Sequence, residues 1–123
     1  MATLNDRVLD NGLTVLDTEA TRVDITSQEA TSYAEATSTY TLGNETSISI
    51  SAPADASPNG RKVTLSAISG ASVTATGTAT HFAISDTSNT RLLATGSLSA
   101  SQAVTSGNTF SLTATDIRIP DPA

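Results

Sequence analysis

The side chains that could do acid–base chemistry in this chain are few and scattered. His81 is the only histidine among 123 residues, so a general base would have to be this imidazole or a carboxylate. No Gly-x-Ser-x-Gly sequence is present, and Ser and Thr are so abundant that a hydroxyl near His81 has no diagnostic value. We therefore expect His81 to be a packed or hydrogen-bonded structural residue. The sequence predicts no catalytic residues and no enzyme.

Carboxylates in pairs could hydrolyse glycosides or bind calcium, but the acids of this chain are spread out. The segments 55–60 and 86–89 each hold one acid beside amide or hydroxyl side chains, well short of an EF-hand loop. Cysteine is absent, and so is any Gly-x-Gly phosphate-binding loop. We expect these acids to shape turns, with calcium binding as the alternative, and we predict no metal and no cofactor.

Length and charge narrow the class of protein. A chain of 123 residues is long enough for one domain with a single two-layer core. With 12 acidic and 6 basic residues the net charge is −6, which argues against nucleic acid as a partner, because affinity for phosphates depends on Lys and Arg. Charged residues interrupt the beginning of the chain, so we expect neither an ordinary signal peptide nor a membrane partner.

Alternation of apolar and polar residues predicts an antiparallel β-sandwich or jelly-roll-like domain over residues 21–123, with about six to seven short strands. We expect a turn at Ser69-Gly70, a bulge at Gly77 and a hairpin turn at 86–89. Residues 30–45 are expected to form a surface loop pinned by Tyr33 and Tyr40. The predicted strands lie at 23–25, 46–51, 62–68, 73–84, 91–98 and 110–119, the last with a change of phase near 115–116.

Residues 1–20 are predicted to form an N-terminal helix or arm, because apolar residues recur at helical spacing between residues 4 and 16. Asn11-Gly12 interrupts this pattern, and a hairpin that turns there is the alternative. A freely mobile tail would not carry Leu4, Val8 and Leu9, so we expect these three residues to form an interface, partly with a neighbouring subunit.

Large apolar side chains are scarce in the predicted domain. Only two Tyr and two Phe are present, and Trp is absent, so burial depends on Val, Leu, Ile and Ala. A small core of this kind gains stability when a face is buried against another subunit. We therefore expect the protein to form homo-oligomers or to be stabilised in a larger assembly.

Seven short segments spread over most of the chain resemble a family of small, mostly uncharacterised proteins encoded among the virion structural genes of tailed bacteriophages. The segments are DRVLDN (6–11), EATSTY (35–40), ISAPAD (50–55), NGRKV (59–63), GTATH (77–81), LLATGSL (92–98) and IPDP (119–122). The resemblance implies a protein that coats or joins parts of a virion, and the family has no established catalytic residues to transfer.

The function implied by this resemblance is that of a capsid decoration, or cement, protein. Its partners would be the major capsid protein or other virion proteins, and it would be located in the virion after synthesis in the host cytoplasm. The alternative is a tail- or fibre-associated adhesin domain that binds a host glycan or surface protein, for which Tyr33 and Tyr40 could provide aromatic faces. A glycan hydrolase is disfavoured by the scattered acids.

Overall fold

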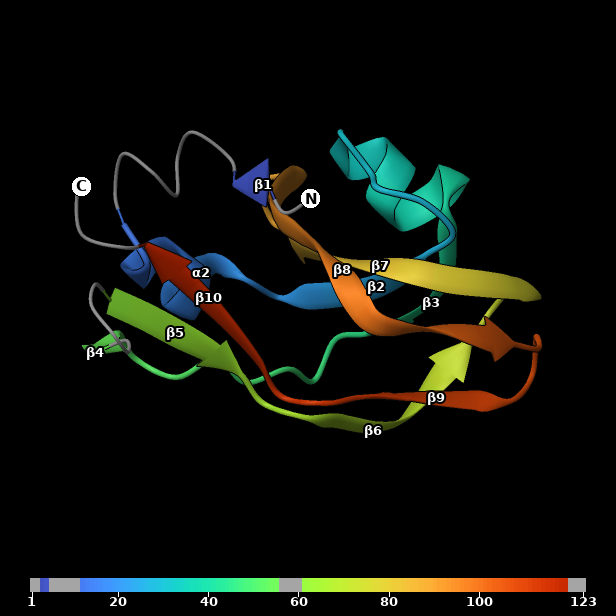
Figure 1. Cartoon of the computed structure of the whole chain (residues 1–123). Helices are drawn as coiled ribbons and strands as arrows, with labels where there is room; N and C mark the ends of the chain where they lie inside the picture. Colours follow the sequence, from blue (N-terminus) through green and yellow to red (C-terminus); the bar gives the residue numbers. More distant parts are fainter. Residues whose placement is uncertain (1–2, 5–11, 56–60, 120–123) are drawn as a thin grey trace.

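The computed structural model describes residues 3–4, 12–55 and 61–119, and within them the fold is mainly β, as predicted (Figure 1). The strands are β1 (Thr3–Leu4), β2 (Arg22–Thr26), β3 (Thr41–Glu45), β4 (Ala54–Asp55), β5 (Arg61–Leu65), β6 (Ile68–Val73), β7 (Gly77–Asp86), β8 (Arg91–Val104), β9 (Thr109–Leu112) and β10 (Thr115–Ile119). The helical elements are α2 (Thr14–Glu19) and the π-helical turn η1 (Glu35–Thr39).

All strand pairs are antiparallel, and they form two sheets. The larger sheet has seven strands in the order β1-β8-β7-β2-β3-β6-β9, and the smaller has three in the order β10-β5-β4. The larger sheet curls, so that β6 and β9 lie across from β2, β7 and β8 (Figure 1). The chain passes from β5 into β6 and from β9 into β10, so the small sheet extends the lower layer.

The hydrophobic core fills the space inside the curl. Val23 and Ile25 of β2 are both fully buried, as their alternation with polar neighbours predicts. Phe82 and Phe110 are buried, whereas Tyr33 and Tyr40 are half-buried. The other large buried residues of this cluster are Leu13, Val15, Leu16, Leu42, Val63, Leu65, Ile68, Val73, Ile84, Leu93, Val104 and Leu112.

The predicted N-terminal helix is described only in part. The helix α2 begins at Thr14, after Gly12, whose φ of 73° is in the left-handed region that favours glycine. Leu4 lies in β1, where it pairs with Ala94 of β8, so the prediction of a helix was wrong at this residue. Residues 5–11, with Val8 and Leu9, lie outside the described residues.

Two predictions for the middle of the chain were wrong. The expected loop at 30–45 contains η1 and all of β3, because its polar residues hydrogen-bond to one another and to β2. Residues 46–51 form no ladder, although Ile50 makes one isolated bridge to Leu65. The alternation predicted their burial correctly but not a strand, since Ile48 and Ile50 pack against the core and the neighbouring serines are exposed.

Two further differences from the predicted strands are bulges. Ser69-Gly70 is not a turn but a bulge inside β6, with Gly70 at φ 70°. The change of face in β7 occurs next to Thr80 rather than at Gly77, where the strand begins. The hairpin turn between β7 and β8 is confirmed, and the predicted change of phase near 115–116 corresponds to the passage from β9 into β10.

Candidate functional site

The outer face of β2 and β7 is buried by the chain's own segment 27–40. On β2, Val23 and Ile25 face the core, so Arg22, Asp24 and Thr26 face outward, yet Asp24 and Thr26 are fully buried. A second small apolar cluster lies on this side of the sheet. It consists of Ala30, Ala36 and Ala83, with Tyr40 and Leu92 packed against it.

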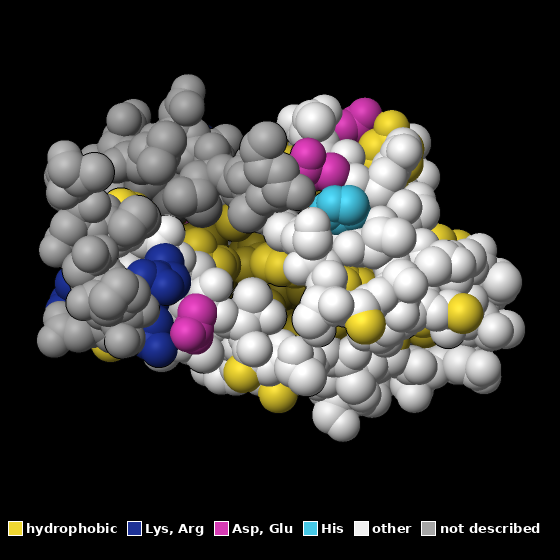
Figure 2. Space-filling model, viewed as in Figure 1, with side chains coloured by type: hydrophobic (Ala, Val, Ile, Leu, Met, Phe, Trp, Pro, Cys, Tyr) yellow, Lys and Arg dark blue, Asp and Glu magenta, His cyan; other side chains and the backbone are white. Residues whose placement is uncertain are grey.

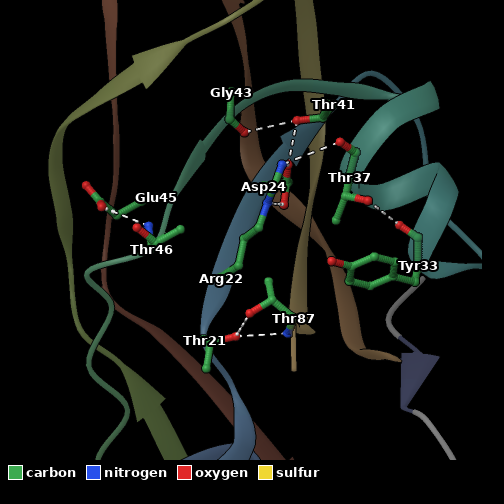
Figure 3. Close-up of polar contacts among 10 residues, drawn as sticks. All are labelled: Thr21, Arg22, Asp24, Tyr33, Thr37, Thr41, Gly43, Glu45, Thr46 and Thr87. Carbon is green, nitrogen blue, oxygen red and sulfur yellow. Dashed lines mark hydrogen bonds and ion pairs between the residues drawn. The ribbon is translucent and has the colours of Figure 1, made fainter. Parts of the chain in front are cut away.

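Asp24 is the centre of the polar contacts beneath this covering segment (Figure 3). Its carboxylate accepts hydrogen bonds from Arg22 Nε at 2.7 Å and Nη2 at 2.8 Å, and from Thr41 Oγ1 at 2.6 Å. Arg22 also donates to the carbonyl oxygen of Thr37, at 3.4 Å. The hydrogen bond with Asp24 raises the pKa of Arg22 above its ordinary value, against the opposing effect of burial.

The Asp24 cluster consists of Asp24, Arg22, Thr37 and Thr41. Its contacts connect β2, β3 and η1, so it holds these elements together rather than forming a reactive centre. Both carboxylate oxygens of Asp24 are engaged by donors, and a bidentate arginine holds the charge in one geometry. Within the covering segment, Glu35 accepts hydrogen bonds from the backbone and hydroxyl of Thr31, at 2.8 and 2.6 Å. These bonds lower the pKa of Glu35 below its ordinary value, the hydroxyl contributing most.

His81 has a hydrogen bond that does not activate a nucleophile. Thr80 Oγ1 lies 2.8 Å from His81 Nδ1 and donates its proton to the carbonyl oxygen of Ser27, at 2.9 Å. A hydroxyl has one proton, so Nδ1 must be the donor in the contact between Thr80 and His81. Thr80 is therefore not activated by this imidazole. His81 is half-buried and is visible on the face shown in Figure 2.

The carboxylate of Asp86 is part of the hairpin turn between β7 and β8. Its oxygens accept hydrogen bonds from the backbone of Ser88 at 3.0 Å, the backbone of Asn89 at 3.4 Å and the side-chain amide of Asn89 at 2.8 Å. These contacts are those of an Asx turn. Across the described residues, no three His, Cys, Asp or Glu side chains lie together as a metal site would require.

A groove of about 690 Å³ lies between β8 and the segment formed by β9 and β10. Figure 2 shows hydrophobic side chains in a hollow in the middle of this face, with uncharged groups along its lower and right edges. Small residues form much of the rim. The residues that line the groove include Ile68, Phe82, Ser97, Leu98, Ala100, Gln102, Leu112 and Asp116.

The β8 wall of the groove is irregular. Ser97 pairs with His81 and Gln102 pairs with Ala79, so the four residues 98–101 lie opposite the single residue Thr80. Gln102 Nε2 reaches across to the carbonyl oxygen of Ser111, at 3.2 Å, and closes one end of the groove. Elsewhere along the groove the described residues form no ladder between β8 and β9.

Among the described residues that line the groove, Asp116 is the one ionisable residue. Its carboxylate accepts hydrogen bonds from Thr64 Oγ1 at 2.7 Å and Lys62 Nζ at 3.1 Å, both on β5. The hydrogen bond from Thr64, followed by that from Lys62, lowers the pKa of Asp116 below its ordinary value. The groove thus has little charge available for an ionic ligand.

The residues expected to form a site or an interface are only partly brought together. Leu4 pairs with Ala94 of β8, three residues before the groove rim begins at Ser97, and Tyr40 packs on the Ala30 cluster. Tyr33 accepts a hydrogen bond at its backbone carbonyl from Thr37, at 2.8 Å. The groove itself was not predicted. The uncharged run 92–104 was the available signal, but alternation alone does not show which edge of a strand stays unpaired.

Comparison with known proteins gave no relatives: no family model, curated protein or solved structure matches this chain. In the described part of the chain no helix has the length and apolar character needed to cross a membrane.

Proposed function

We propose that this protein is a structural component of a tailed-phage virion, a capsid decoration or cement protein that stabilises the shell through protein–protein contacts and has no enzymatic activity. The observation that carries the proposal is the open, apolar and nearly uncharged groove beside β8, which is suited to a polypeptide rather than to an ionic ligand. The sequence resemblance described above supplies the virion context.

The ionisable groups support a contact function. The carboxylates of Asp24, Asp86 and Asp116 are each engaged by hydrogen-bond donors from the fold. His81 is hydrogen-bonded through Thr80 to the covering segment. A catalytic acid or base would need a free position near a reacting group, and these contacts instead hold strands and turns together.

Counting copies in purified virions tests the proposal. Quantitative mass spectrometry against the major capsid protein should find hundreds of copies per particle if this is a decoration protein. A few copies per particle would favour the tail- or fibre-associated adhesin. Absence from particles, with the chain present in infected cells, would refute a virion role.

A truncation tests the part assigned to the N-terminal segment. Deletion of residues 1–12 removes Leu4, Val8 and Leu9 together, and we expect it to weaken attachment to undecorated particles by at least about tenfold while the β domain still folds. The matched control is the full-length chain at equal concentration. Full occupancy of the particles by the truncated chain would show that this segment is not an interface.

A further inference from the structure

We propose that the groove between β8 and the β9–β10 segment binds an extended segment of a partner protein, which lies as an added strand along residues 98–102 of β8. The site is argued from the groove alone; only the identification of the partner as a virion protein rests on the proposed function. Strand addition is a recurrent mode of peptide recognition, in which main-chain hydrogen bonds give affinity and alternate side chains fill pockets.

The edge of β8 already accepts a strand next to the groove. Thr3 and Leu4 of β1 pair with Thr95 and Ala94 on this edge, in antiparallel register. The groove rim begins at Ser97, two residues further along the same edge. An extended segment in the groove would therefore continue an interface that the fold itself uses.

The backbone along this part of β8 is not fully paired with β7. Residues 98–101 lie opposite Thr80 alone, so β7 cannot pair with each of them. Ser99, Ala100 and Ser101 are exposed, so water can hydrogen-bond to their backbone groups, and an extended segment would replace that water with main-chain hydrogen bonds. Natural edge strands are usually protected by charged residues or proline, but neither type occurs from Leu92 to Val104.

The groove also defines the chemistry of its occupant. The side chains of Ile68, Phe82, Leu98 and Leu112 form an apolar floor, so the occupant should direct small or medium apolar side chains inward at alternate positions. Asp116 is engaged by Lys62 and Thr64, so a charged inward side chain would have no available partner. The net charge of −6 on this chain opposes the approach of a second copy, which favours a different protein.

A fused strand tests whether the groove accepts such a segment. β1 and β8 are antiparallel, with Thr3 opposite Thr95. In an N-terminal extension that keeps this register, the residue added directly before Met1 would lie opposite Leu98. The residues added before it would lie opposite the residues that follow Leu98. The added sequence Val-Thr-Val-Thr-Val places valine opposite Leu98, Ala100 and Gln102. The matched control, Thr-Val-Thr-Val-Thr, has nearly the same composition in the opposite phase.

The in-phase extension should raise Tm by about 4 °C and slow amide hydrogen exchange at residues 98–102 by about tenfold, whereas the control should leave both unchanged. No protection from the in-phase extension, or equal protection from both, would overturn the proposal. Because this experiment uses the isolated protein, its result does not depend on a virion role.

Photo-crosslinking identifies the occupant in assembled particles. A benzophenone side chain at Ala100, on the groove rim, should cross-link to one extended segment of another virion protein, and the same group at Ala103, exposed on β8 outside the groove, should not. Cross-links to a second copy of this chain, or equal cross-links from both positions, would contradict the assigned occupant. A failure of the proposed virion function and a failure of the proposed groove can be told apart, because the copy number in virions tests the function and the fused strand tests the groove.

Discussion

The outer face of β2 and β7 and the seam between β8 and β9 are closed in different ways. The outer face is covered by the chain's own segment 27–40 and fastened through Asp24, which is fully buried. The seam is bridged by one described side-chain contact, between Gln102 and Ser111, and leaves an apolar groove open. The same sheet therefore has one face that the chain completes itself and one seam that it leaves open.

This difference indicates which region contributes to the stability of the fold and which region is available to bind a partner. Buried polar groups on the outer face are costly unless they are paired, so changes there should affect folding. Residues on the groove rim are exposed, so changes there should affect folding little and binding strongly. Substitutions in the two regions test this assignment.

The largest expected effect is that of Asp24→Ala. Removal of the carboxylate leaves Arg22, partly buried, and the Thr41 hydroxyl without their shared acceptor, and we expect a loss of about 3 kcal/mol in the free energy of unfolding. Urea denaturation measures it. Asp24→Asn, which keeps an acceptor for Thr41, should lose less. A loss below about 0.5 kcal/mol for the alanine variant would show that the Asp24 cluster does not fasten the covering segment.

A matched pair of threonine substitutions should give the next largest effect. Thr41→Val removes the 2.6 Å hydrogen bond to Asp24 and should cost about 2 kcal/mol. Among the described residues the fully buried hydroxyl of Thr26 has no hydrogen-bond partner, so Thr26→Val should be neutral or stabilising by about 1 kcal/mol. Thermal melts compare the two variants, and equal losses would refute the distinction.

Ala100→Lys should change the free energy of unfolding by less than about 0.5 kcal/mol, because Ala100 is exposed on the groove rim. The charge should nevertheless prevent an extended partner from pairing with this edge, and we expect attachment to undecorated particles to fall by at least about tenfold. Ala103→Lys, outside the groove, is the control and should attach normally. Normal attachment of both variants would assign binding to another surface.

The smallest expected effect concerns Asp116. Because its pKa is lowered, its interactions with Thr64 and Lys62 stabilise the fold above the ordinary pKa of aspartate, and this contribution is lost as pH falls through the lowered value. A ¹³C titration of the side-chain carboxyl should give a midpoint below the ordinary aspartate value. Thr64→Val should shift that midpoint upward, and an unchanged midpoint would show that Thr64 is not the main cause.

Much of the β fold could be predicted from the sequence, because burial on one face of a strand repeats every two residues. The alternation at Val23/Ile25, Val63/Leu65 and Phe110/Leu112 predicted buried faces that the structure confirms. Alternation failed at 46–51, where half-buried isoleucines lie outside any ladder. Periodicity reports which side chains face a core, and hydrogen bonding to another strand decides whether the segment is a strand.

The mainly antiparallel class, the hairpin turn at 86–89 and many side chains of the core could thus be predicted from the amino-acid sequence, since these depend on local periodicity and turn chemistry. Three features became apparent only in the folded protein: the segment 27–40 covers Asp24, β1 docks on β8, and the seam beside β8 stays open. These features join residues far apart in the chain. They depend on how far the sheet curls before its edges meet, which no short stretch of sequence specifies.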